Sequence, residues 1–121
     1  MAPDGTSIEP TIDEAGDLFD MANLYPRTTG LPVTVWVSPR GGARHDVRVK
    51  AAQTPGDRME LADVATIAVR PQPRVIHGQL SSEIERAVLA WTTTNTDALV
   101  DYWDGRLDTI ELGARLVRFQ P

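Results

Sequence analysis

The stretch that decides the fold is residues 31–51, LPVTVWVSPRGGARHDVRVKA. In its first part, residues 31–38, valines recur at every second position, and this period of two with β-branched side chains indicates a strand. Gly41 and Gly42 allow the positive φ angles that a tight hairpin turn needs. In its second part, residues 43–51, charged and apolar residues alternate, which predicts an antiparallel partner strand with one wet and one buried face.

The sheet is expected to continue downstream. A third strand is predicted over residues 64–70, where apolar side chains again recur at every second position. Pro71 and Pro73 end this strand, because proline cannot donate a hydrogen bond to a neighbouring strand. Residues 74–77 could add a short fourth strand at the edge of the sheet, and the two preceding prolines leave its pairing open.

The period of the apolar residues changes to about 3.6 after Ser82, which has the spacing of a capping box with Glu85. Residues 92–95, Thr-Thr-Thr-Asn, are poor helix formers, so we expect the helix to kink or restart there. Gly105 is a natural stop for it. Residues 107–119 fit either a strand or a helix, and we expect a short helix or an irregular tail packed on the sheet.

Together these elements predict an α+β domain over residues 21–121. It would be a three- to four-stranded antiparallel meander with one long or broken C-terminal helix packed on one face. The core is predicted to combine one face of each strand with the apolar stripe of the helix: Val33, Val35, Val37, Val47, Val49, Ile67, Val69, Ile84, Val88, Trp91 and Leu99.

The length and composition of the chain limit the classes of protein to which it could belong. A chain of 121 residues without cysteine fits one domain and excludes disulfides and thiolate catalysis. No run approaches the roughly 20 apolar residues that a membrane span needs. The first residues also lack the basic start and apolar run of a signal peptide. We therefore expect a cytoplasmic protein that does not bind a membrane.

The net charge of −5 is unevenly distributed along the chain. Residues 1–20 hold six acidic residues and no basic one, whereas residues 21–78 hold eight basic and four acidic ones. Such asymmetry indicates either an anionic partner or an acidic face that pairs with a basic one. We expect residues 1–20 to be a flexible acidic tail. A short amphipathic helix, capped by Thr11 and Glu14 and docking on a partner, is the alternative. Met21 is an alternative translation start.

The two histidines lie outside any catalytic motif. His45 is expected to be a half-buried structural residue on the core face of the second strand, bonded to a backbone carbonyl. His77 is expected to be exposed in a turn. The two could meet if the strands over residues 43–51 and 74–77 were neighbours. Two histidines alone are too few ligands to indicate a metal site.

Four aspartates recur at helical spacing, namely Asp97, Asp101, Asp104 and Asp108. A solvated acidic face is the expected interpretation, because cation sites usually need oxygens that converge from a loop. The sequence holds no phosphate loop, nucleophile elbow, HExxH or dinucleotide fingerprint. We therefore expect no catalytic residues, no metal site and no cofactor, in a protein that is not an enzyme.

Basic residues form the most distinctive predicted surface. They follow the hairpin beside a tryptophan on the same sheet, and the candidate binding residues are Arg40, Arg44, Arg48, Lys50 and Trp36. Cations and aromatic rings on a strand face can bind single-stranded nucleic acid. Ion pairing of Asp46 with Arg44 and Arg48 would explain the same charges without a ligand.

Two stretches carry resemblances. Residues 91–103, WTTTNTDALVDYW, resemble the C-terminal helix of a family of short bacterial domains of unknown function, often encoded beside toxin–antitoxin-like partners. Ala98 stands where that family usually has glutamate. The run through TGLP (29–32), VWVS (35–38) and GGARHDVRVK (41–50) resembles small uncharacterised proteins of proteobacteria. This resemblance implies a shared fold over residues 21 to about 104 and carries no activity with it.

These observations favour a protein-interaction or regulatory module with an unknown protein partner. A nucleic-acid-binding protein that uses the basic hairpin at residues 40–50 is the alternative.

Overall fold

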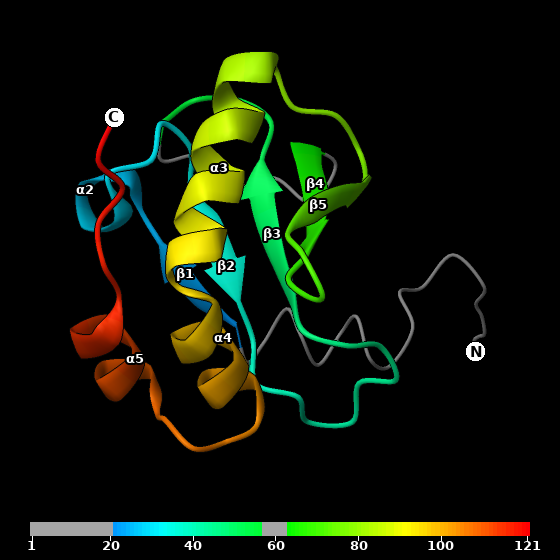
Figure 1. Cartoon of the computed structure of the whole chain (residues 1–121), viewed down its shortest axis with the longest axis vertical. Helices are drawn as coiled ribbons and strands as arrows, with labels where there is room; N and C mark the ends of the chain where they lie inside the picture. Colours follow the sequence, from blue (N-terminus) through cyan, green and yellow to red (C-terminus); the bar gives the residue numbers. More distant parts are fainter. Residues whose placement is uncertain (1–20, 57–62) are drawn as a thin grey trace, which may run out of the picture.

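Five antiparallel strands form one sheet in which each strand pairs with its neighbour in sequence (Figure 1). The computed structural model describes residues 21–56 and 63–121, so the predicted tail over residues 1–20 lies outside the described residues. The strands are β1 (Ala22–Leu24), β2 (Val35–Val37), β3 (Arg48–Ala52), β4 (Val64–Ala68) and β5 (Arg74–His77). The antiparallel meander is confirmed, and the prediction of three to four strands was slightly low.

The missing strand was β1, at one edge of the sheet. It has only three residues, of which Ala22 pairs with Val37 and Leu24 with Val35. Three residues are too few to establish a period of two, so the alternation that indicated the other strands could not indicate this one.

The predicted hairpin between β2 and β3 is instead a long loop over residues 38–47. The backbone N–H of Arg40 donates to the carbonyl of Trp103 at 2.9 Å, and Ala43 closes a turn onto the Arg40 carbonyl at 2.8 Å. Gly41 has the expected positive φ of 50°. Because the loop is held toward the end of a helix, β3 begins only at Arg48.

Four described helices accompany the sheet: α2 (Pro26–Thr29), α3 (Ser82–Thr94), α4 (Thr96–Trp103) and α5 (Thr109–Arg115). The prediction of one long or broken C-terminal helix was slightly low: α3 and α4 are separated at Asn95, as the Thr-Thr-Thr-Asn stretch indicated, and α5 follows them. The N-cap of α3 is Ser81, whose hydroxyl accepts from the Ile84 N–H, and not Ser82. The ambiguous residues 107–119 form α5, started by a capping box of Asp108 and Glu111, and then a tail without regular structure.

The core lies between the sheet and the α3–α4 pair, which cross one face of the sheet (Figure 1). Every residue of the predicted core is buried, with Val33, Val35 and Val88 among those fully enclosed. At roughly 1.5–3 kcal/mol for each fully buried aliphatic side chain, this layer is the main source of stability.

The opposite face of the sheet is the outer face, and one row of side chains crosses it. Residues directly opposite on neighbouring strands share a face of the sheet. The registers of all four strand pairs align into a single row on the outer face: Asn23, Trp36, Lys50, Thr66 and His77. This row places one aromatic and one cationic side chain next to each other at the centre of the sheet.

The C-terminal tail returns to the first helix. The Phe119 N–H donates to the Thr29 carbonyl at 2.7 Å, and the Arg118 guanidinium donates to the carbonyls of Arg27 and Thr28. The tail therefore connects α5 to the opposite end of the sheet, beside α3 (Figure 1).

Candidate functional site

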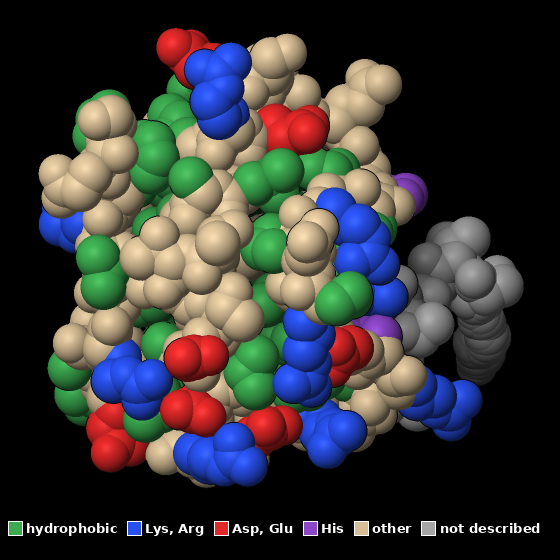
Figure 2. All heavy atoms as spheres, viewed as in Figure 1, with side chains coloured by type: hydrophobic (Ala, Val, Ile, Leu, Met, Phe, Trp, Pro, Cys, Tyr) green, Lys and Arg blue, Asp and Glu red, His purple; other side chains and the backbone are tan. Residues whose placement is uncertain are grey.

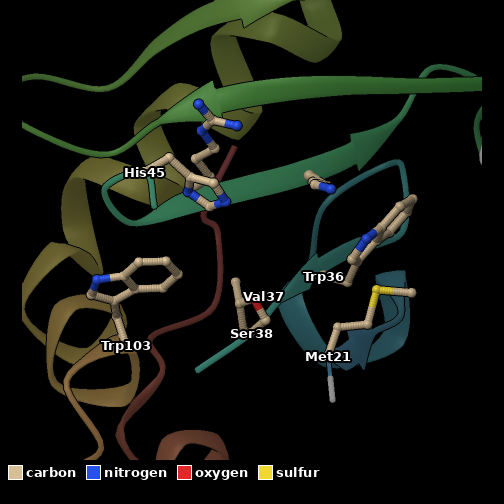
Figure 3. Close-up of a pocket in the computed structure, with 8 residues that line it drawn as sticks. Met21, Trp36, Val37, Ser38, His45 and Trp103 are labelled. Carbon is tan, nitrogen blue, oxygen red and sulfur yellow. The ribbon is translucent and has the colours of Figure 1, made fainter. Parts of the chain in front are cut away.

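A small recess, here called the niche, lies where β2 ends and β3 begins (Figure 3). The space inside it that a water-sized sphere can enter is about 10 Å³. That is close to the minimum volume that one water molecule needs. The niche is lined by Met21, Trp36, Val37, Ser38, His45, Arg48, Lys50 and Trp103.

Three of the five predicted binding residues meet at the niche, and two do not. Trp36, Arg48 and Lys50 line it, whereas Arg40 and Arg44 are exposed on the loop over residues 38–47. The prediction that Arg44 shares one strand face with Arg48 and Lys50 was wrong, because β3 begins only at Arg48.

Trp36 is buried, contrary to the exposed stacking surface that the sequence suggested. Only 2% of its surface is accessible, and it lies between Asn23 and Lys50 in the outer-face row. Its indole Nε1 is buried and has no hydrogen-bond partner among residues 21–56 and 63–121. Figure 3 shows the nitrogen on the side of the ring that faces the niche, whereas the nitrogen of Trp103 faces away from it.

Arg48 and Lys50 add two cations to the same wall of the niche. Both are half-buried on β3, and neither forms an ion pair with any residue in 21–56 or 63–121. Their side chains are donors only. The niche therefore brings together two cationic groups that have no acidic partner among the described residues.

His45 and Trp103 close one side of the niche. Their ring centroids are 5.4 Å apart with an interplanar angle of 32°. His45 Nδ1 donates to the Asp46 carbonyl at 2.7 Å, which confirms the expected half-buried histidine bonded to a backbone carbonyl. Its predicted place on the core face of a strand was wrong, since His45 precedes β3. Trp103, the last residue of α4, brings the helix to this wall.

Asp46 is the acid that interrupts the basic stretch, and its ion-pair partner lies outside that stretch. Its carboxylate oxygens accept from Arg70 Nε and Nη2, both at 2.8 Å. This bidentate bond holds the pKa of Asp46 below its ordinary value, and Asp46 raises the pKa of Arg70. The predicted pairing of Asp46 with Arg44 and Arg48 was wrong, and so Asp46 does not neutralise the niche.

Two of the four aspartates, Asp101 and Asp104, pair with arginines. Asp101 pairs with Arg106 at 3.2 Å and with Arg115 at 3.4 Å, and Asp104 pairs with Arg106 at 3.4 Å. Figure 2 shows acidic and basic side chains intermingled at this end of the helical face. Asp108, the last of the series, caps α5.

The part of the chain that the structure describes contains no group of three His, Cys, Asp or Glu residues placed to hold a metal ion. His77 is exposed, as expected, but it is the last residue of β5 and does not lie in a turn. The strand that follows His45 and the strand that carries His77 are not neighbours, because β4 lies between them.

Comparison of the chain with protein-family models, with curated proteins and with solved structures found no match. Among the described helices, none is long and apolar enough to cross a membrane.

Sequence reasoning missed Met21, His45 and Trp103 as parts of the niche, and Arg70 as the partner of Asp46. Met21 and Trp103 lie 82 positions apart, and no periodic pattern joins such distant residues. The one available signal was Asp46 itself. A single acid among arginines in a strand with a wet face indicates an ion pair, but not which arginine supplies it.

Proposed function

We propose that this protein is a non-enzymatic interaction module that binds an acidic segment of a partner protein at the niche. The observation that carries this proposal is that Arg48 and Lys50 line one recess and form no ion pair with any residue that the structure describes. A carboxylate is acceptor-only when ionised, and charge-assisted hydrogen bonds to it are the strong ones.

The size of the niche favours one oxygen of a carboxylate group as its occupant. A space of about 10 Å³ takes one oxygen atom and not a sugar or a base. The rest of the partner segment would lie outside the niche, where the exposed Arg40 and Arg44 are available to its other acidic side chains. Such contacts act mainly on the rate of association and on specificity, and they weaken with salt.

Nucleic acid is the second candidate, supported by the same four cations on and beside β3. Trp36 disfavours it, because an indole that is 2% exposed cannot offer its face to a base. Binding would then be limited to phosphates, with little sequence preference. The proposed setting of either function is the cytoplasm.

The test is a fluorescence titration of the full chain with a labelled glutamate-rich peptide and with the same peptide carrying glutamine. We expect binding of the glutamate peptide alone, and a loss of about tenfold or more in the Arg48→Gln/Lys50→Gln variant. The matched control is Arg86→Gln/Arg106→Gln, which removes two exposed arginines elsewhere and should bind like the wild type. Equal binding by wild type and Arg48→Gln/Lys50→Gln would contradict the proposal. Binding of a single-stranded oligonucleotide in place of the peptide would favour the second candidate.

A further inference from the structure

We propose that the outer face of the sheet, next to the niche, binds a phosphorylated side chain of the partner segment. This inference rests on the proposed function, because two residues of the surface, Arg48 and Lys50, also line the niche. The remaining residues of the surface lie on β5, which the proposed function does not use.

The surface is built by the registers of three strands. Two rows of directly opposite residues cross β3, β4 and β5 on the outer face: Arg48, Ala68 and Arg74, and then Lys50, Thr66 and His77. Directly opposite residues share a face of the sheet, and so do residues two apart on one strand. We call the members of these rows on β3 and β5 the basic cluster: Arg48, Lys50, Arg74 and His77. The members on β4 are short, so they form a low floor between the longer side chains.

A bulge in β5 brings His77 into the basic cluster. Thr66 pairs with His77 and Ile67 pairs with Val75, so Ile76 is an extra residue on β5. Without this bulge, Ile76 would lie opposite Thr66 and would place an apolar side chain on the patch. The irregularity therefore puts an imidazole, which always has an N–H donor, where regular pairing would put an isoleucine.

No acidic residue neutralises the basic cluster in the ranges 21–56 and 63–121. None of the five described strands contains aspartate or glutamate, and no ion pair among the described residues includes a member of the cluster. The neighbouring acid, Asp46, is bound by Arg70. Arg74 donates to the Gln72 carbonyl at 3.3 Å, a bond that leaves its charge unpaired. Three cations and an imidazole thus share a patch on which the described chain places no anion.

The dimensions of the patch suit one phosphoryl group. With neighbouring strands about 4.8 Å apart, the β3 and β5 backbones are about 10 Å apart, and the two rows are about 7 Å apart along the strands. Arginine and lysine side chains are long enough to converge above the floor from these positions. A phosphorylated side chain carries a charge of about −1.5 to −2 and three acceptor oxygens. A carboxylate offers only two oxygens and a single charge, so the number of donors favours the phosphoryl group.

The partner segment of the proposed function is the source that the geometry favours. Because Arg48 and Lys50 belong to both surfaces, an extended segment with a carboxylate at the niche would pass over the basic cluster about three residues further on. The phosphodiester of a nucleic acid carries only one charge per phosphate, which leaves part of the cluster unpaired.

The test titrates the full chain with three labelled peptides of one glutamate-rich sequence, whose central residue is glutamate, phosphoserine or serine. We expect the phosphoserine peptide to bind about tenfold or more tighter than the glutamate peptide. In Arg74→Gln/His77→Gln this advantage should be lost, whereas the affinity for the glutamate peptide should stay close to that of the wild type, because neither residue lines the niche. The control Arg86→Gln/Arg106→Gln, which removes two exposed arginines elsewhere, should keep the advantage. Thermal melts followed by circular dichroism verify that each variant is folded.

The outcomes separate the two proposals. Equal affinity of the wild type for the phosphoserine and glutamate peptides overturns the inference and leaves the proposed function standing. An advantage of phosphoserine that survives Arg74→Gln/His77→Gln also overturns the inference. Binding of the phosphoserine peptide alone, lost in that variant, supports the inference and overturns the carboxylate site of the proposed function. No binding of any peptide overturns both. A single-stranded oligonucleotide that displaces the phosphoserine peptide at equal concentration would assign the basic cluster to nucleic acid, against the inference.

Discussion

The side-chain amide of Asn95 and the backbone of Val117 form a pair of hydrogen bonds. Asn95 Nδ2 donates to the Val117 carbonyl at 3.0 Å, and the Val117 N–H donates to Asn95 Oδ1 at 2.8 Å. The same amide also donates to the Trp91 carbonyl at 2.9 Å. Asn95 is only 3% exposed, so the residue that interrupts the α3–α4 pair also fixes the C-terminal tail.

Replacing Asn95 with alanine should destabilise the protein by about 1–3 kcal/mol, because it removes the buried bond to the Trp91 carbonyl and both partly buried bonds to the Val117 backbone. The measurement is urea unfolding followed by circular dichroism. Thr94→Ala is the control one residue earlier, since Thr94 is exposed and bonds only within its helix. It should change the free energy of unfolding by less than about 0.5 kcal/mol. Similar effects of both substitutions would show that the tail does not depend on Asn95.

Trp91 should be among the most costly side chains to remove. It is 1% exposed at the centre of the core, so Trp91→Ala should cost about 3–5 kcal/mol. Its Nε1 has no hydrogen-bond partner in the part of the chain that the structure describes, so Trp91→Phe should lower the free energy of unfolding less than Trp91→Ala does. Chemical denaturation of both variants checks the order. A Trp91→Ala protein as stable as wild type would contradict the buried position of this ring.

Gly78 and Gly105 have the same backbone conformation but different surroundings, so substituting each with alanine separates backbone strain from steric clash. Both have a left-handed φ, 78° and 79°, so alanine at either position costs about 1–2 kcal/mol from the backbone alone. A Cβ at Gly78 would also lie 2.8 Å from the Val64 carbonyl oxygen, whereas nothing lies within 4 Å at Gly105. Gly78→Ala should therefore lower the melting temperature more than Gly105→Ala does. Equal losses would mean that β4 moves to accept the methyl group.

The Asp46–Arg70 pair predicts a small pH dependence of stability. The bound guanidinium lowers the pKa of Asp46, so the folded state favours the ionised carboxylate. Its contribution is present above the ordinary aspartate pKa of about 3.9 and is lost as pH falls through the lower pKa of the folded state. Because the side chains are 51% and 43% exposed, the effect should be at most about 1 kcal/mol. Stability curves of wild type and Asp46→Asn, measured from neutral to acidic pH, should converge at the acid end. Parallel curves would contradict the pairing.

The sequence predicted the features that depend on local periodicity. The valines of β2 and β3 and the stripe of α3 face the core as expected, since alternation and the 3.6-residue period report burial directly. The break at Asn95 was also predictable from the preceding threonines.

The remaining features depend on contacts between distant residues. The loop over residues 38–47 is positioned by Trp103 and by Arg70, and neither interaction has a local sequence signal. In the alternating pattern of β2, Trp36 is assigned to the solvent-facing side of the sheet, yet it is buried. Periodicity gives the face of a strand on which a residue lies, but not what covers that face. The sequence therefore predicted the cations of the candidate site, but it did not predict that the site is an enclosed recess.

The order of the strands has a consequence for the time course of folding. Every strand pairs with its neighbour in sequence, so the sheet can grow by closing short loops, and short closures are the fastest steps available to a chain. The bond between Phe119 and Thr29 joins residues 90 positions apart, so we expect it to form after the sheet exists. By the same reasoning, the amide of Phe119 should exchange with deuterium well before the amides of β3, which have pairing strands on both sides.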